Sequence, residues 1–181
     1  MKSLARPLLV ARIAVIFYTA VCLLKLFLIA TDNPLAQGTH GITPVSFWVP
    51  IAMIPSVMAS IFFLHRAYSN AFAAHPEALT IKPLLAAAVW FIPVVNLFLP
   101  GYVVYELWKA NGPSAESERG WRMPALFLVW WVCWLIGTTP FIGAIRLPYL
   151  IELAVQTAAI VVAALAFVGI LKQIAQRQES L

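Results

Sequence analysis

The hydrophobic positions of the chain fall into five long apolar segments, separated by short polar linkers. Four segments are long enough to cross the hydrocarbon core of a bilayer, which takes about 20 residues of helix. These predicted spans are Leu8–Ala30, Val45–Leu64, Pro124–Ile145 and Pro148–Leu171. The pattern therefore predicts an all-α integral membrane protein that forms one helical domain over residues 1–181.

The fifth segment, Pro83–Lys109, contains the stretch WFIPVVNLFLP, in which two prolines bracket an asparagine. Pro93 and Pro100 each lack a backbone N–H, and Asn96 between them offers its own donors and acceptor. Each flank of the stretch is long enough to form a helix across about half of the hydrocarbon core. The segment predicts either a re-entrant hairpin that returns to the same side, or a kinked helix that makes a fifth crossing.

Basic residues favour the hairpin, because Lys and Arg accumulate on the cytoplasmic side of membrane proteins. Five crossings divide the basic residues equally between the two sides. Four crossings with a hairpin leave only Lys25 and Arg146 outside. The remaining basic residues then lie inside with both termini: Lys2, Arg6, Arg12, Arg66, Lys82, Lys109, Arg119, Arg122, Lys172 and Arg177.

Composition supports the membrane assignment, since 62% of the residues are hydrophobic and only 10% are charged. A soluble domain of this length could not cover so much apolar surface. The net charge of +5 comes from scattered residues, so we expect no nucleic-acid partner. Cys22 and Cys133 lie inside apolar segments and outside any CxxC pair, which predicts neither a disulfide nor a metal site.

Three motifs in the middle of the chain resemble those of a known family. They are HRAYSN from His65, WFIPVVNLFLP from Trp90, and ELWKA from Glu106. In this order and register they resemble a bacterial integral-membrane domain family of unknown function. One departure is Gly101, which stands where that family usually has tyrosine, with Tyr102 displaced by one position. The resemblance implies a bacterial cytoplasmic (inner) membrane and no particular activity.

Four polar residues are expected at membrane depth: Lys25, Asn96, Glu152 and Gln156. Ionisable groups inside a membrane are costly and therefore mark candidate functional sites. Structural explanations compete with this view. Lys25 can extend toward the outer interface, Glu152 sits in a first helical turn that favours a carboxylate, and Asn96 can cap the broken segment. We also expect Lys25 and Glu152 to share one depth and to pair, directly or through Gln156.

Candidates at the cytoplasmic interface come from the motifs. We expect Glu106 to form an ion pair with Arg66, because a paired interfacial charge costs less than an isolated one. Asn70 belongs to the first motif, and Trp108 is expected as an interfacial anchor at a segment end.

No catalytic pattern is present. The sequence lacks HExxH, GxSxG and a Gly-rich phosphate loop. Its histidines, His40, His65 and His75, lie outside the middle of the spans, so no axial ligand for a buried haem is offered. We therefore expect no catalytic residues, no cofactor and no enzyme activity.

Two functions remain open. The preferred hypothesis is a scaffold or accessory subunit of a membrane assembly, with the lipid bilayer and either other membrane proteins or further copies of the chain as partners. The alternative is a small transporter or channel component whose path is lined by Asn96, Glu152 and Gln156, because broken helices mark binding sites in transporters. The alternative predicts a cavity that reaches Asn96, whereas the scaffold predicts a dry, packed tip.

Overall fold

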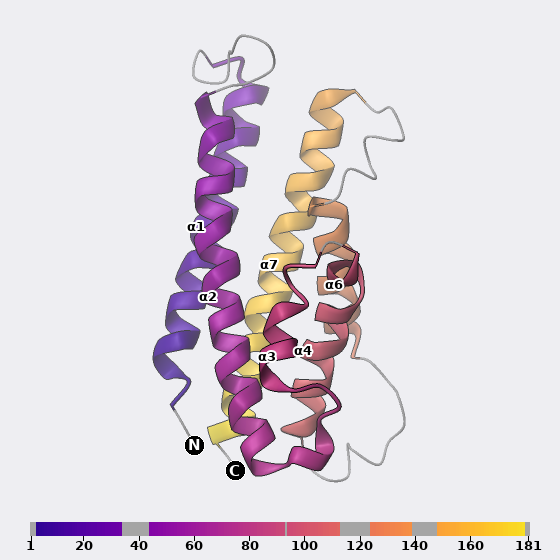
Figure 1. The fold of residues 1–181 in the computed structure, drawn as a ribbon. Coiled ribbons are helices and arrows are strands. Elements are labelled where there is room, and N and C mark those ends of the chain that lie inside the picture. The colour runs from indigo at the N-terminus through magenta and orange to yellow at the C-terminus, as the bar shows by residue number, and fades with distance from the viewer. Residues whose placement is uncertain (1–2, 34–43, 93, 113–123, 139–147, 180–181) are drawn as a thin grey trace.

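The computed structural model describes residues 3–33, 44–92, 94–112, 124–138 and 148–179, and these residues form helices without any strand. Three long helices, α1 (Ala5–Ala30), α2 (Pro44–Ala74) and α7 (Tyr149–Glu179), run side by side (Figure 1). The shorter α6 (Ala125–Thr138) packs along α7. The all-α prediction is confirmed, and α1, α2 and α7 are long and apolar enough to cross a membrane.

Two of the predicted spans end too early. Helix α2 continues past Leu64 to Ala74, and α7 continues past Leu171 to Glu179. Hydropathy detects only the apolar part of each helix, whereas the polar extensions are fixed by contacts between the helices. Helix α6 ends at Thr138, and its 14 residues are about 21 Å long. Residues 139–145 of the predicted third span lie outside the described part, so a fourth full crossing is not shown.

The fifth apolar segment is broken into two helices. Its first arm is α3 (Pro83–Ala88), followed by turns, the short 3-10 helix η4 (Val95–Leu97) and the second arm α4 (Leu99–Ala110). The helix of the first arm ends at Ala88. Ile92 precedes a proline, and the residue before proline disfavours the helical conformation. Pro93 itself lies outside the described residues. Pro100 occupies the first turn of α4, where its missing N–H costs little.

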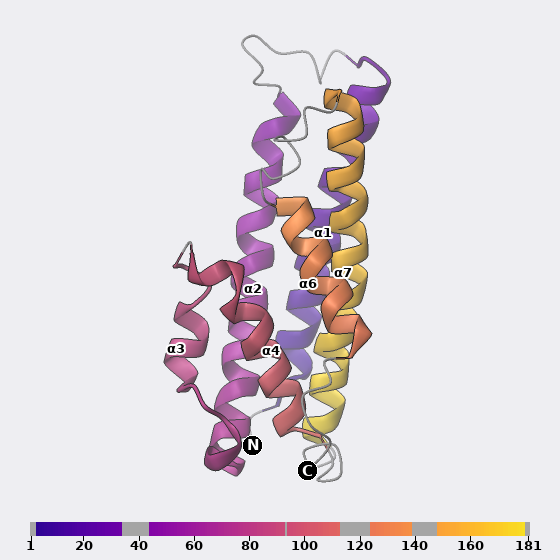
Figure 2. The same ribbon diagram turned by 90° about the vertical axis from the view of Figure 1, so that its right-hand side faces the viewer.

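The two arms run in opposite directions and lie at one end of the bundle (Figure 2). Helix α1 begins and α7 ends at this same end, which we call the terminus end. The opposite end is where α1 finishes and α7 starts. The hairpin packs against α2, and its second arm also packs against α6 and α7. The terminus half of the bundle is therefore thicker than the opposite half.

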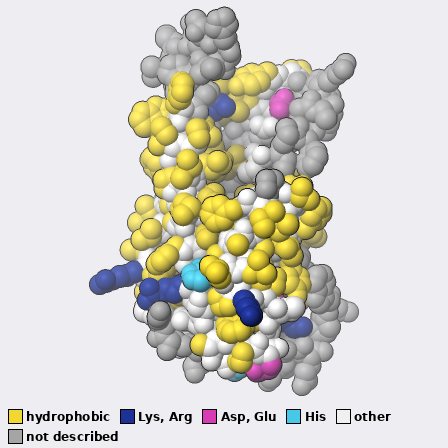
Figure 3. Space-filling model, viewed as in Figure 1, with side chains coloured by type: hydrophobic (Ala, Val, Ile, Leu, Met, Phe, Trp, Pro, Cys, Tyr) yellow, Lys and Arg dark blue, Asp and Glu magenta, His cyan; other side chains and the backbone are white. Residues whose placement is uncertain are grey.

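Large apolar side chains cover much of the surface (Figure 3). On α1 the exposed ones extend from Leu9 to Phe27, about 27 Å along the helix. On α2 they extend from Phe47 to Phe62 and on α7 from Tyr149 to Leu165, while the later turns of both helices carry no exposed large apolar residue. Such an apolar belt is typical of a membrane protein, and its length matches the hydrocarbon core of about 30 Å.

The best-packed core lies in the terminus half. It joins α2, α4, α6 and α7 through side chains that are almost completely buried: Phe63, Val103, Val104, Leu107, Phe127, Trp130, Ile170, Leu171 and Ile174. Trp130 stacks on Phe167 with 4.9 Å between ring centroids. This core fixes the second arm of the hairpin against three helices.

Candidate functional site

Glu106 is buried on α4, where it accepts hydrogen bonds from three groups. The Tyr68 hydroxyl of α2 donates to its Oε2 at 2.6 Å, and the backbone N–H of Thr80 donates to its Oε1 at 2.6 Å. The Tyr102 hydroxyl, one turn earlier on α4, donates to the same Oε1 at 3.3 Å. Charge-assisted bonds of this kind are the strong ones in proteins. They connect α2, the linker before α3 and the second arm of the hairpin.

The expected Glu106–Arg66 ion pair is wrong. Tyr68 supplies the contact from α2, and the buried Nε atom of Arg66 has no hydrogen-bond partner in the described structure. Successive helical residues are rotated by about 100°, so Arg66 and Tyr68 cannot both face α4. Next to Arg66, the Nδ1 atom of His65 lies 3.2 Å from the carbonyl oxygen of Pro83 and ties α2 to the start of α3.

Two other candidates, Asn70 of α2 and Trp108 of α4, contact the polar end of α7. Asn70 donates to the Oε1 of Gln178 at 3.2 Å, and Gln178 in turn donates to the carbonyl oxygen of Ala67 at 2.7 Å. Trp108 donates from Nε1 to Gln173 at 3.0 Å, while the Arg177 guanidinium lies 3.8 Å from the Trp108 ring centroid. Asn70 and Trp108 therefore attach α2 and α4 to the last turns of α7.

Beyond the tip of the hairpin lies a cavity of about 430 Å³. Helices α1, α2, α6 and α7 and the tip of the hairpin contribute to its wall, and the lining side chains are mainly apolar. They are Val15, Tyr18, Met53, Ser56, Val57, Ser60, Trp90, Asn96, Leu97, Trp130, Trp134, Thr138, Ile160, Ala163, Ala164 and Phe167. The cavity lies between the hairpin tip and the four helices α1, α2, α6 and α7.

The hairpin tip brings two unpaired polar atoms to this region. The Nε1 atom of Trp90 and the Oδ1 atom of Asn96 are buried and have no hydrogen-bond partner in the described structure. The expected role of Asn96 as a cap or crosslink is therefore not fulfilled by its Oδ1. A buried polar group without a partner costs about 1–3 kcal/mol, so a small movement of the tip that brought a ligand or a water molecule to either atom would be stabilising.

Two hydroxyl groups of the wall are already occupied as donors. Ser60 donates to the Ser56 carbonyl oxygen at 2.7 Å, and Thr138 donates to the Trp134 carbonyl oxygen at 2.7 Å. Hydroxyl groups of this kind satisfy themselves within their own helix. Trp90 and Asn96 differ from them, because each has a buried polar atom without a hydrogen-bond partner in the described structure.

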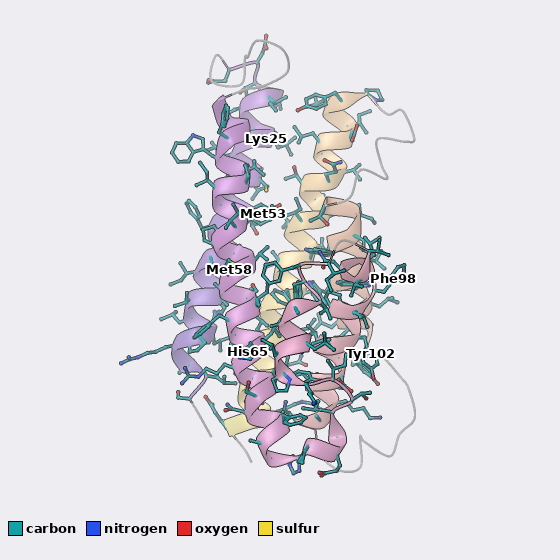
Figure 4. All side chains as sticks on the ribbon, viewed as in Figure 1. Lys25, Met53, Met58, His65, Phe98 and Tyr102 are labelled. Carbon is teal, nitrogen blue, oxygen red and sulfur yellow. The ribbon has the colours of Figure 1, made fainter. Side chains whose placement is uncertain are left out.

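The two ionisable candidates of the spans lie at the opposite end of the bundle. Figure 4 shows Lys25 near the end of α1, and Glu152 occupies the first turn of α7, which begins at that end. Gln156 donates from Nε2 to Glu152 Oε1 at 3.2 Å. No ion pair joins Lys25 and Glu152 within the described structure. They share an end of the bundle, as expected, without the direct pairing.

Close packing explains the departure at Gly101. A Cβ atom placed there would lie 3.0 Å from Cδ2 of Trp131 on α6. The small residue therefore lets α4 approach the indole ring, which stacks on Trp134 with 5.1 Å between ring centroids. The displaced Tyr102 takes part in the Glu106 cluster instead.

A comparison with protein families matches residues 35–176 to the family described as "Domain of unknown function (DUF4328)". The chain belongs to this family. The match extends well beyond the three motifs in the middle of the sequence. No curated protein and no solved structure matches the chain.

In this DUF4328 protein, the sequence does not predict the roles of several site residues. Tyr68 lies inside the HRAYSN motif, so the motif itself was a signal, but the ionic partner Arg66 was preferred. Trp90 begins the second motif, yet nothing in the sequence indicated a free indole N–H. Thr80, Gln173, Arg177 and Gln178 lie in polar stretches with no local signal.

Among the described residues of this DUF4328 protein, no three or more His, Cys, Asp or Glu side chains lie close enough together to hold a metal ion. Cys22 is buried on α1 and Cys133 is half-buried on α6, and both are free thiols. The cavity at the hairpin tip is therefore the strongest candidate site.

Proposed function

We propose that this protein is a multi-pass membrane protein that binds a small molecule in a cavity within the bilayer, as a non-enzymatic transporter or channel component. The observation that carries the proposal is the cavity at the hairpin tip, whose wall includes Asn96. A scaffold would have a packed tip there, whereas a binding protein needs this space. Ligand cavities in proteins have volumes of about 300–1,000 Å³, a range that includes this one.

The proposed topology has four crossings and a hairpin that enters the membrane from the cytoplasm. Its support comes from the distribution of basic residues and from the position of the tip. Phe98 at the tip lies level with Met58 of α2, and Tyr102 lies level with His65 (Figure 4). From Met58, the apolar face of α2 continues to Phe47, about 16 Å further. The hairpin thus covers roughly half of the bilayer, with both termini in the cytoplasm.

Irregular backbone inside a membrane must find its hydrogen-bond partners within the protein. At the tip, the N–H groups of Asn96, Leu97 and Phe98 donate to carbonyl oxygens of the preceding turn, while the apolar residues Phe91, Val94 and Phe98 are exposed. The turns between α3 and α4 lie beside the cavity, with α2 and α6 as neighbours of the hairpin. In transporters, broken helices of this kind place polar groups at the midplane. We assign Asn96 and Trp90 to that role here.

Cysteine reactivity tests the proposal. In a background with Cys22→Ala and Cys133→Ala, we expect Ser60→Cys on the cavity wall to react with the small neutral reagent N-ethylmaleimide. Ala67→Cys is the matched control, because Ala67 is buried on the same helix outside the cavity. Equal protection of the two cysteines in lipid nanodiscs would show that the tip is packed and would favour the scaffold.

A further inference from the structure

We infer that the ligand of the cavity is an uncharged, largely apolar molecule that carries both a hydrogen-bond acceptor and a hydrogen-bond donor at one end, such as a long-chain alcohol or amide. This inference rests on the proposed binding function. It concerns the chemistry of the ligand, which follows from the groups that line the wall.

The wall excludes charged ligands. Among the residues that the structure describes, its lining contains no Lys, Arg, His, Asp or Glu. A charge that leaves water for such an environment without a partner pays a large desolvation penalty. Lys25 lies on α1, seven residues beyond the lining residue Tyr18, a rise of about 10 Å along the helix. An ion in the cavity would therefore have no countercharge in direct contact.

The cavity wall offers a suitable surface for the apolar part of the ligand. Trp130, Trp134 and Phe167 line one side of the cavity, and Trp130 and Phe167 are stacked with an interplanar angle of 19°. Ala163 and Ala164 of α7, one turn before Phe167, are small residues that also line the cavity. Flat aromatic groups beside small residues accommodate alkyl chains or rings through dispersion contacts.

The polar end of the ligand is defined by the hairpin tip. Trp90 Nε1 is a donor only, so it requires an acceptor, and Asn96 Oδ1 is an acceptor that requires a donor. A hydroxyl or a secondary amide supplies both kinds of group without charge. A site with buried polar groups discriminates strongly against analogues that leave them unpaired. Simple hydrocarbons should therefore bind less well than alcohols of equal length.

Photo-crosslinking provides the test, with the full chain in phosphatidylcholine nanodiscs. The probe is dodecanol with a diazirine in its alkyl chain. Unlabelled dodecanol should abolish the saturable labelling. Dodecane, dodecanoate at a pH where it is ionised, and dodecyltrimethylammonium should each require at least tenfold higher concentrations. Labelled peptides should include the lining segments of α2, α6 or α7.

Two substitutions identify the polar groups. Trp90→Phe and Asn96→Leu should each reduce the apparent affinity for dodecanol about tenfold. Trp48→Phe is the matched control, because Trp48 is 58% exposed and lies outside the cavity. Ser60→Leu, which fills the cavity from α2, gives an independent loss of labelling if the Asn96 variant does not assemble.

The outcomes separate the two proposals. Equal competition by the charged molecules, or equal affinity of the Trp90 and Trp48 variants, would overturn the ligand class and leave binding in the cavity intact. Absence of saturable labelling by any probe, together with an unreactive Ser60→Cys, would overturn the binding function and the inference together.

Discussion

The Tyr68 hydroxyl donates a 2.6 Å hydrogen bond to the Glu106 carboxylate and thereby joins α2 to the second arm of the hairpin. The two residues belong to different motifs of the sequence and meet only in the folded chain. Because Glu106 also binds the Thr80 backbone and Tyr102, its carboxylate organises the base of the hairpin.

We expect Tyr68→Phe to lower the free energy of unfolding by about 1–3 kcal/mol, because the carboxylate loses a buried donor. Glu106→Gln should be destabilising as well, since an amide offers only one acceptor oxygen to three donors. The two changes share one interaction, so their combined effect should be smaller than their sum. Thermal unfolding in detergent measures all three variants.

Arg66→Gln is the control for this double-mutant comparison. Arg66 forms no hydrogen bond or ion pair with Glu106 in the described structure, so the effects of Arg66→Gln and Glu106→Gln should add. Strong coupling between Arg66 and Glu106, with none between Tyr68 and Glu106, would contradict the described geometry and restore the ion pair.

Gly101→Ala should destabilise the protein by about 1–3 kcal/mol, because the added methyl group meets the rigid Trp131 ring and overpacks the site. Gly169→Ala is the control, since its Cβ would lie 3.7 Å from a Leu126 side-chain atom, an ordinary contact. Alanine there should be neutral or stabilising. Melting temperatures of the two variants compare them directly, and equal values would refute the close approach of α4 to α6.

Gln178→Ala removes the bonds to Asn70 and to the Ala67 carbonyl oxygen, so we expect a loss of about 1–3 kcal/mol. Gln176→Ala, two residues earlier on the exposed side of α7, should change stability by less than about 0.5 kcal/mol. Hydrogen exchange at the last turns of α2 and α7 should increase only in the Gln178 variant. Unchanged exchange there would argue against this attachment.

Topology can be measured by labelling single cysteines in intact cells. Ala78→Cys before the hairpin and Ser117→Cys after it should both resist an impermeant thiol reagent applied outside. Thr31→Cys, at the opposite end of the bundle, should react. Ser117 lies outside the described residues, and its expected side comes from the charge distribution. External labelling of Ser117 with protection of Ala78 would support five crossings.

The helices were largely predictable, because the energetic cost of exposing apolar residues to water leaves a long-range pattern in the sequence. The break in the hairpin was predictable too, since the backbone chemistry of proline acts locally. The ends of α2 and α7 were not predictable, because residues such as Asn70 and Gln178 become helical through contacts between distant segments. Hydropathy contains no information about those contacts.

The candidate site was harder to predict. Asn96 is a candidate because an amide in an apolar segment is unusual, but the cavity beside it is formed by residues of four helices that are distant in the sequence. The partner of Glu106 depended on which face of α2 turns toward α4. Charge complementarity favoured Arg66, whereas the helix rotation places Tyr68 there.

The two arms of the hairpin are unequally secured. Helix α3 packs mainly against α2, and its Leu84 is 78% exposed, whereas α4 contacts α2, α6 and α7. Segments with few neighbours open at the lowest free-energy cost. A movement that widens the cavity would therefore displace α3 and the adjoining Trp90 away from the bundle, while α4 stays packed against its three neighbouring helices. The indole N–H of Trp90, one of the two groups assigned to the ligand, would move together with α3.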